Sequence, residues 1–330
     1  MRAQVIKSFG GPEVLEGADI PRPVAGPGQV LVRVAASSVN PVDTKIRRKG
    51  GAYSGSLPVV LGADAAGVVE ALGAGVTGFA VGDAVYGSVG GVRGLQGTLA
   101  EYVAADARLL AHAPRSLPLA DAAALPLVAI TAWEGLVEEA RVQRGESVLV
   151  LGGTGGVGHV AVQLARELGA VVTAAVSSDD KAQLARELGA THVVDYRKER
   201  VEDYVARITN GRGFDVVFDA TGGSDPSAAF AAARVRGRVV TIVTAFTADL
   251  TPMHMKGLSL HAVFMLIPML HDSGREAHGA ILREVARLVD ADRLRPVIDS
   301  RFPLARAAEA HARIESGKAV GKIVVDVAAP

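Results

Sequence analysis

The stretch that decides the fold is SVLVLGGTGGVGHVAVQLARELG, residues 147–169. Its first six residues form a short apolar run typical of a buried strand, and apolar residues then recur at helical spacing from Val157 to Leu168. Between the two lies Gly153-Thr154-Gly155-Gly156-Val157-Gly158, which fits the pattern G-x-G-x-x-G. A strand, a glycine turn and a helix in this order leave free backbone N–H groups at the start of the helix, where a pyrophosphate binds. The stretch therefore predicts a dinucleotide-binding unit rather than an unrelated glycine turn.

The composition is that of a globular protein without a charge bias. Of its 330 residues 49% are hydrophobic, which is enough for the cores of two domains. Lys plus Arg and Asp plus Glu each number 35, so we expect no binding of nucleic acid or of an anionic membrane by charge. The sequence contains no cysteine, which excludes disulfides, thiolate nucleophiles and zinc sites with sulfur ligands.

No stretch is typical of a membrane span or a signal peptide. The longest apolar runs, residues 122–133 and 262–270, are shorter than the roughly 18 residues that a span needs, and both contain proline. The N-terminal MRAQVIKSFGG lacks the apolar centre of a signal peptide and is typical of a strand that runs into a turn. We therefore expect a cytoplasmic location.

The first part of the chain predicts a β-rich domain. Short alternating runs separated by glycine and proline indicate strands at 3–7, 30–36, 66–72, 83–87 and 99–103. From Leu119 the sequence becomes rich in alanine, and Pro126 stands where a proline opens a helix, predicted over 127–141. This helix is expected to bridge two domains, and its Trp133 is expected to pack in a core.

Beyond residue 146 the predicted elements alternate between strand and helix. The strands are 147–152, 171–176, 192–194, 214–219 and 238–243, and the helices are 157–168, 179–188, 201–209 and 226–234. Such alternation predicts a parallel, doubly wound sheet, with 258–264 as a further edge strand. Helices over 282–290 and 304–316 precede a last strand, 323–327, that is expected to rejoin the first domain. The predicted domains are thus 126–270 and 1–125 completed by 271–330.

The end of the second strand of the parallel sheet bears on the choice of cofactor. An acid at this position accepts hydrogen bonds from the ribose of NAD, but the strand ends in Ser177-Ser178. The acids that follow, Asp179 and Asp180, fall in the first turn of a helix, where the helix dipole alone explains them. Ser177 and Lys181 are therefore candidates to hold a 2′-phosphate, the alternative for Lys181 being a solvated helix face.

Several stretches resemble one family. They are Ser38-Val39-Asn40-Pro41-Val42-Asp43-Thr44, Leu61-Gly62-Ala63-Asp64-Ala65-Ala66-Gly67, Gly97-Thr98-Leu99-Ala100-Glu101-Tyr102, Ala124-Leu125-Pro126-Leu127, Thr131-Ala132-Trp133-Glu134 and the glycine motif. The chain resembles the medium-chain dehydrogenase/reductase family, and in it the zinc-free NADPH:quinone oxidoreductase (zeta-crystallin-like) branch. The resemblance implies an α/β protein: a GroES-like β-barrel catalytic domain and a Rossmann cofactor domain, with the active site in the cleft between them.

The same resemblance implies that no metal is bound. Zinc-dependent members of the family carry a cysteine where this chain has Asn40, and a His-Glu pair where it has Ala63-Asp64. The four-cysteine structural lobe is also absent, and none of the eight histidines forms an i, i+4 pair. A simple alcohol or aldehyde is hard to polarise without a Lewis acid. A quinone or an activated enone needs less help, because its conjugation spreads the negative charge after hydride transfer.

The resemblance also suggests which residues act. Asn40 corresponds to a polar group beside the nicotinamide and the substrate, and Tyr53 and Thr131 correspond to hydrogen-bond donors that line the cleft. Asn40 could instead be a turn residue before proline, and Tyr53 a surface aromatic on a glycine-rich loop. Lys45 stands where some members carry a tyrosine, so the proton donor stays open.

The implied cofactor is NADP(H), with NADPH preferred to NADH. In the family's pattern Gly155, Gly156, Val157 and Gly158 match the pyrophosphate loop, and Ser177 and Lys181 match the 2′-phosphate site. Tyr196 matches a tyrosine near the adenosine, with Arg197 as a weaker candidate. The nicotinamide amide is expected near backbone at Val243, Thr244 and from Phe264 to Leu266.

Three functions are compatible with these residues. Reduction of quinones comes first, and reduction of enones, alkenals or similar activated alkenes is a close second. The third, of a different class, is a cofactor-binding structural or regulatory protein with little turnover. The apolar edge segment 258–266 further predicts a homo-oligomer, most simply a dimer, otherwise a tetramer.

Overall fold

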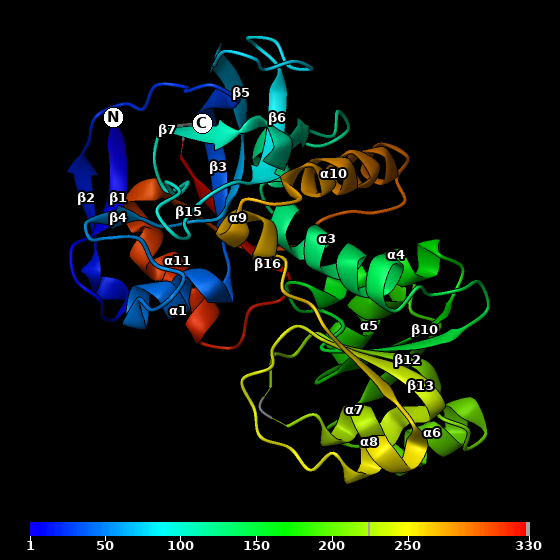
Figure 1. The fold of residues 1–330 in the computed structure, drawn as a ribbon. Coiled ribbons are helices and arrows are strands. Elements are labelled where there is room, and N and C mark those ends of the chain that lie inside the picture. Colours follow the sequence, from blue (N-terminus) through cyan, green and yellow to red (C-terminus); the bar gives the residue numbers. More distant parts are fainter. Residues whose placement is uncertain (224, 328–330) are drawn as a thin grey trace. The chain divides into compact units, whose positions relative to one another are not determined.

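The computed structural model describes residues 1–223 and 225–327. The chain divides into two compact units, one formed by residues 1–130 and 266–330 and the other by residues 131–265 (Figure 1). The chain leaves the first unit through helix α3 (Pro126–Trp133) and returns to it before helix α9 (Ile267–His271). No helix among the described residues combines the length and the apolar character that crossing a bilayer requires.

The second unit contains a six-stranded parallel sheet. Its strands are β9 (Ser147–Leu151), β10 (Val171–Val176), β11 (His192–Asp195), β12 (Phe214–Asp219), β13 (Ala233–Thr241) and β14 (Ser259–Ala262). They follow the order β11-β10-β9-β12-β13-β14, and every neighbouring pair is parallel. The direction of winding reverses between β9 and β12. In such sheets ligands bind outside the carboxyl ends of the strands at this switch point, which here follows Leu151 and Asp219.

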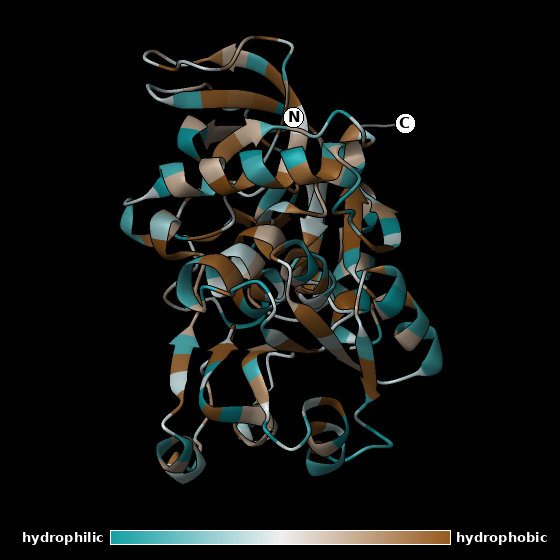
Figure 2. Cartoon of the chain, turned by 90° about the vertical axis from the view of Figure 1, so that its right-hand side faces the viewer, coloured by the Kyte–Doolittle hydropathy of each residue, from teal (hydrophilic) through white to brown (hydrophobic). Residues whose placement is uncertain are grey.

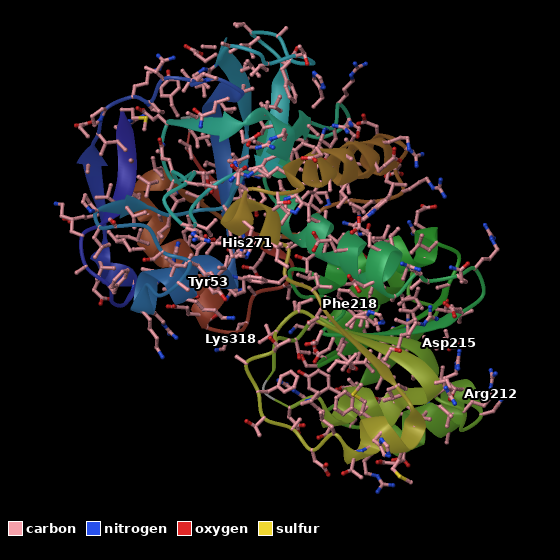
Figure 3. The ribbon with its side chains drawn as sticks, in the orientation of Figure 1. Tyr53, Arg212, Asp215, Phe218, His271 and Lys318 are labelled. Atoms are coloured by element: carbon pink, nitrogen blue, oxygen red, sulfur yellow. The ribbon has the colours of Figure 1, made fainter. Side chains whose placement is uncertain are left out.

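Helices complete the second unit and close its core. They are α4 (Gly158–Glu167), α5 (Asp179–Glu187), α6 (Val201–Thr209), α7 (Ser227–Ala232) and α8 (Thr251–Lys256). Figure 2 shows hydrophobic residues along the strands and hydrophilic residues on outward turns of helices. The core includes Leu149, Val194, Tyr204, Phe214 and Phe230. Residues Asp215 and Phe218 lie toward opposite ends of β12 (Figure 3), and Phe218 is fully buried.

The first unit is organised around strand β3 (Gln29–Val39). This strand pairs with β5 (Asp64–Leu72), β7 (Tyr102–Asp106) and β16 (Lys322–Asp326), all antiparallel. The larger sheet has the order β15-β16-β3-β5-β6-β8, with β15 (Ile298–Pro303), β6 (Ala84–Ser88) and β8 (Leu110–His112). A smaller sheet joins β2 (Leu15–Asp19), β1 (Arg2–Ile6) and β4 (Val59–Val60). The pairing of β16 with β3 confirms the prediction that the last strand rejoins the first domain.

Helical segments cover the sheets of the first unit. The α-helices are α1 (Pro41–Lys49), α2 (Leu119–Ala122), α9, α10 (Arg275–Asp290) and α11 (Ala307–Glu315). Single turns occur at η1 (Pro12–Val14), η2 (Ala107–Leu109) and η4 (Leu304–Arg306). Tyr86 of β6 donates to the carbonyl of Leu282 at 2.5 Å, which ties α10 to the larger sheet.

Four sequence predictions need correction. The helix predicted over 127–141 is α-helical only to Trp133 and continues as π-helical turns, η3 (Glu134–Glu139). Gly135 lies in this π-helical part, and a Cβ there would lie 2.5 Å from the ring of Phe218, so close packing demands glycine. Trp133 itself is half-buried and not a core residue. The strand predicted at 99–103 is β7, which begins at Tyr102, and the helix predicted at 282–290 begins at Arg275.

Candidate functional site

The glycine motif lies between β9 and α4, at the switch point of the parallel sheet. The backbone N–H and the ring Nδ1–H of His159 both donate to the carbonyl of Gly155, at 3.1 and 3.0 Å. His159 is fully buried, so these two hydrogen bonds hold the loop against the interior of the unit. Thr154 is buried as well, at 4% exposure. The carbonyl of Gly155 is thereby tied to the first turn of α4, which holds the glycine loop in one place at the start of the helix, where an anion binds in folds of this kind.

Two of the glycines are required by close contacts. A Cβ on Gly158 would lie 2.0 Å from the carbonyl oxygen of Gly152, and one on Gly153 would lie 2.8 Å from the Cβ of Ala174 in β10. A side chain at Gly158 would thus collide with backbone, while one at Gly153 would push the loop off the sheet. These are the roles of a tight turn and of close helix–strand packing in a dinucleotide fold. The glycine loop 153–158 and the first turn of α4, here called the cradle, therefore have the form that a pyrophosphate site requires.

The predicted 2′-phosphate residues meet at the carboxyl end of β10. Lys181 Nζ donates to Ser177 Oγ at 3.2 Å, so the ammonium reaches back across the first turn of α5. The backbone N–H of Tyr196 donates to the carbonyl of Val176 at 3.2 Å, which places Tyr196, 55% exposed, next to this pair. The structure thus brings together Ser177, directly after β10, Tyr196, directly after β11, and Lys181, in the first turn of α5, without an acid at position 177.

The acids nearby are occupied by a lysine that the sequence analysis left out. Lys198 Nζ lies 3.2 Å from Asp179 and 3.1 Å from Asp195. The hydrogen bond from the backbone N–H of Arg197 lowers the pKa of Asp195, and the hydrogen bond from Lys198 lowers it further. Asp179 and Asp195 are thus paired with Lys198, whereas the ammonium of Lys181 faces Ser177.

The loops after the remaining strands lie along the same edge of the sheet. Val243 and Thr244 follow β13, and Val263 N–H donates to the carbonyl of Thr241 at 2.9 Å, which holds the segment that contains Phe264 beside them. Phe264 is 39% exposed, whereas Leu266 is buried and belongs to the first unit. The edge of the sheet thus carries most of the residues that the resemblance assigned to the nicotinamide end.

Sequence reasoning missed the loop after β12, although it faces the glycine loop. Asp219 accepts from the backbone N–H and the hydroxyl of Thr221, at 2.9 and 2.6 Å. A Cβ on Gly152 would lie 3.3 Å from the methyl group of Thr221, so the two loops touch at the switch point. The signal was present as Asp219-Ala220-Thr221-Gly222, a polar glycine turn directly after a buried strand.

In the first unit Asn40 is fully buried in a polar network. Asn40 Nδ2 donates to Asp64 Oδ2 at 2.8 Å, and Asn40 Oδ1 accepts from Lys322 Nζ at 2.5 Å. Ser38 Oγ donates to the same oxygen of Asp64 at 2.7 Å. Asn40 also precedes α1, and its backbone N–H donates to Asp43 at 2.8 Å. The contacts of its side chain are therefore with Asp64 and Lys322.

Burial shifts the pKa values of two groups in this network, Asp43 and Lys322. Burial raises the pKa of Asp43 to about 7; the hydrogen bond from the N–H of Asn40 opposes this rise, and the nearby Asp64 adds a smaller one. Burial lowers the pKa of Lys322, and the carboxylates of Asp64 and Asp43 oppose that shift. The network thus holds one cation between two acids in a site closed to water. Lys322 was not predicted, although a lysine at the head of a buried strand was a visible signal.

The other three candidates are placed apart from this network. Tyr53 lies in the loop after α1 (Figure 3), 40% exposed, and its carbonyl accepts from the backbone N–H of Arg93 at 2.7 Å. Lys45 is on the exposed side of α1. Thr131 is a buried residue of α3 and belongs to the second unit. Their roles stay predictions.

The residues present do not resemble a metal centre. In residues 1–223 and 225–327 there is no group of three or more histidine, aspartate or glutamate side chains that could hold an ion. Where the zinc-dependent enzymes have a cysteine, Asn40 uses its oxygen to accept from an ammonium group. Metal-independence stays a prediction, which the donor set supports.

Comparisons with known proteins agree with this architecture. Residues 26–115 match the alcohol dehydrogenase GroES-like domain, and residues 188–325 match the zinc-binding dehydrogenase family. A chloroplastic NADPH-dependent alkenal/one oxidoreductase of Arabidopsis thaliana is 37% identical over 335 residues, 98% of this chain and 79% of that protein. A 2-methylene-furan-3-one reductase of Solanum lycopersicum is 36% identical with the same coverage, 98% and 79%.

Solved structures are similar along the whole chain. An alcohol dehydrogenase superfamily protein from Novosphingobium aromaticivorans has 42% identity and a TM-score of 0.93, over 99% of this chain and 100% of the other. A mycobacterial protein solved with NADPH has 31% identity and a TM-score of 0.87, with coverage of 99% and 100%. A mycobacterial quinone oxidoreductase has 32% identity and a TM-score of 0.84, again over 99% and 100%.

Proposed function

We propose, from the premise that this chain belongs to the zinc-free branch of the medium-chain dehydrogenase/reductase family, that it uses NADPH to reduce a conjugated carbonyl compound. The first candidate substrates are alkenals and enones, reduced at the carbon–carbon double bond. This places them ahead of the quinones that the sequence alone favoured, because the two relatives described above are named as reductases of such compounds. Quinones are the second candidate, supported by the similarity to the mycobacterial quinone oxidoreductase.

The observation that carries the proposal is the cradle of the second unit. Gly158 has room for no side chain, and Lys181 Nζ lies 3.2 Å from Ser177 Oγ. The glycine loop with the first turn of α4 would hold the pyrophosphate, and Ser177 with Lys181 would hold the 2′-phosphate. Tyr196 would lie near the adenosine. Bound there, NADPH supplies a hydride.

The protein itself has to supply a hydrogen-bond donor to the substrate oxygen and to position the substrate. Hydride arrival at the β-carbon moves charge onto the substrate oxygen, and a hydrogen-bond donor at that oxygen stabilises it. Tyr53 and Thr131 are the proposed donors, with Lys45 a lesser one. One proton, from such a donor or from water, completes the addition of hydrogen across the double bond. Positioning and exclusion of water supply the rest.

A panel of substrates tests this function. NADPH absorbance is followed with an alkenal, a cyclic enone and a benzoquinone, and a saturated aldehyde of the same size serves as the control. We expect oxidation with the enone and alkenal, slower or equal oxidation with the quinone, and none with the saturated aldehyde. NADPH binding without oxidation across the panel would instead favour the structural or regulatory role.

The proposal extends to the partners and the location. The proposal needs a small-molecule substrate and neither nucleic acid nor a membrane. A cytoplasmic location stays part of the proposal, and fluorescence of a tagged chain in its own cell would test it.

A further inference from the structure

A row of buried polar side chains crosses four neighbouring strands of the first unit. The pairs Ile323↔Val39, Ser38↔Asp64 and Asp64↔Ser88 align β16, β3, β5 and β6. Lys322 is 3% exposed, Ser38 is 1% exposed, and Asn40, Asp64 and Ser88 are fully buried. Charged groups are almost never buried to this extent unless they are paired.

Within the row Ser38, Asn40, Asp64 and Lys322 are joined by direct contacts, whereas Ser88 Oγ has no hydrogen-bond partner among the residues that the structure describes. Lys322 Nζ lies 2.5 Å from Asn40 Oδ1, 3.1 Å from the carbonyl of Val39 and 3.6 Å from Asp64 Oδ2. Because Asn40 Nδ2 donates to the same Asp64 oxygen, a flip of the amide would set its N–H against the ammonium and its oxygen against the carboxylate. The amide of Asn40 therefore has one orientation.

The row also holds the starts of two helices. Asp64 Oδ1 accepts from the backbone N–H of Leu127 at 2.9 Å, in the first turn of α3. Asn40 precedes Pro41, the first residue of α1, and its backbone is bound to Asp43. A carboxylate that accepts from a first-turn N–H satisfies a donor that the helix leaves unpaired. The positive end of the helix dipole also stabilises its negative charge.

Stability alone is a weak reason for such a row. A buried ion pair often contributes less than apolar side chains of the same volume, because both charges lose their hydration. What the pair does fix is geometry. One helix that it anchors leads into the loop of Tyr53, and the other carries Thr131 one turn after Leu127.

We propose that Lys322 is a positioning residue for the reduction: by holding Asp64 and Asn40 it sets the first turns of α3 and α1. The reading rests on the proposed function, in which Thr131 and Tyr53 are donors to the substrate. Lys322 touches neither of them and acts through Asp64 and Asn40.

The chain carries its own probes for this role. Trp133, the last residue of α3, is the sole tryptophan, so its emission and its quenching by acrylamide report on that helix. There are two asparagines, Asn40 and Asn210, so protein labelled with ¹⁵N-asparagine gives two side-chain amide pairs. Asn210→Asp identifies which pair belongs to Asn40.

The test compares Lys322→Met with Lys256→Met in the full chain. Lys256 is a matched control because its Nζ binds three carbonyls, those of Phe230, Ala231 and Ala233, but lies in the second unit. For Lys322→Met we expect kcat to fall about tenfold to a hundredfold, the scale of a misplacement of about 1 Å. The Kd of NADPH should stay within about twofold, since its proposed ligands lie in the other unit. Trp133 quenching and amide exchange of Asn40 should both rise, and Lys256→Met should change none of these.

A second variant guards against simple loss of folding. Asp64→Asn with Lys322→Met removes both members of the buried ion pair and leaves Asp43, which keeps its hydrogen bond from the N–H of Asn40. If this double variant regains the wild-type kcat and Trp133 quenching, the ion pair is merely structural and the proposal is overturned. A folded Lys322→Met that behaves as wild type would overturn it as well. A wild-type protein that reduces nothing would contradict the proposed function, while the Trp133 and Asn40 signals would still decide the role of Lys322.

Discussion

At the carboxyl end of β10 a single side chain bears on which dinucleotide is bound. Ser177 stands where NAD-binding folds carry an acid, and Lys181 lies against it at 3.2 Å. A carboxylate at this position would repel a 2′-phosphate, whereas a serine and an ammonium attract one. The closeness of Ser177 and Lys181 could be predicted from the sequence because the two residues are four positions apart at the start of α5.

Lys181→Ala should weaken NADPH binding and leave NADH binding nearly unchanged. A hydrogen bond to a charged group contributes about 1.5–3 kcal/mol, which corresponds to roughly tenfold to a hundredfold in Kd. Lys198→Ala is the matched control, since that lysine is engaged by Asp179 and Asp195. The Kd of both cofactors is measured by fluorescence titration. Equal weakening of NADPH and NADH by Lys181→Ala would show that the 2′-phosphate is bound elsewhere.

Ser177→Asp should reverse the preference. The new carboxylate would repel the 2′-phosphate and could accept from the ribose hydroxyls, so NADH should bind more tightly than NADPH. The ratio of the two Kd values checks this, with Ser177→Ala as the uncharged control. A variant that keeps the wild-type ratio would remove Ser177 from the site.

Two buried groups should give stability opposite dependences on pH. The folded pKa of Asp43, about 7, lies above its unfolded value of about 3.9, so the folded state keeps a proton that the unfolded chain has lost. The free energy of unfolding therefore falls as the pH rises through this window. For His311 burial, with a smaller effect from Arg47, lowers the pKa to about 3, below the unfolded value of about 6.5. Here stability is lost as the pH falls from 6.5 toward 3.

Asp43→Asn should remove the first of these slopes. Relative to wild type the variant should gain stability between pH 5 and pH 8, by at most about 1.4 kcal/mol per pH unit. Urea unfolding at both pH values measures the difference, with the exposed Asp180→Asn as the control. A constant difference between wild type and variant would mean that Asp43 is already ionised at pH 5.

At the scale of elements, the sequence predicts the second unit better than the first. The strands of the parallel sheet and helices α4 to α7 appear within a few residues of their predicted places, because short apolar strands alternate with segments of helical periodicity and glycine often separates them. Helix α1 was missed because Asn40-Pro41 is also a turn signal, and only the bond from Asn40 to Asp43 makes it a helix start. The contact between Asn40 and Lys322 joins residues 282 positions apart, which no local pattern reveals.

The turn from β9 into α4 should tolerate alanine at one glycine and not at another. Gly158→Ala puts a Cβ 2.0 Å from the carbonyl of Gly152, whereas Gly155→Ala puts one 3.3 Å from the same oxygen. We expect Gly158→Ala to lower both Tm and NADPH affinity, because the backbone of the loop must move. Gly155→Ala should change Tm far less. Calorimetry of the two variants decides, and equal Tm values would mean that the turn is less confined than the contacts indicate.

For the whole molecule, the edge of the parallel sheet is the expected site of self-association. Strand β14 pairs with β13 on one side and ends the sheet. Because Val263 N–H points to β13, the N–H of Ala262 points outward by alternation, toward a strand that could pair with it. An exposed edge of this kind is commonly covered by a two-fold partner.

Ala262→Pro should therefore weaken a dimer of the wild-type chain, since it removes an outward N–H and leaves the bonds to β13 intact. Sedimentation at micromolar protein measures the change, and Ala262→Ser, which keeps the outward N–H, is the control. A monomeric wild type would count against the expected homo-oligomer, whatever the variant does.

The central claim is that hydride passes from NADPH to a carbon of a conjugated carbonyl compound. NADPH deuterated at C4 of the nicotinamide, in separate 4R and 4S forms, is incubated with the protein and a cyclic enone, and the product is analysed by mass and NMR. We predict a saturated ketone that carries one deuterium at the β-carbon with one of the two forms and none with the other. A product without deuterium from either form, or enone recovered unchanged while NADPH stays bound, would contradict the account.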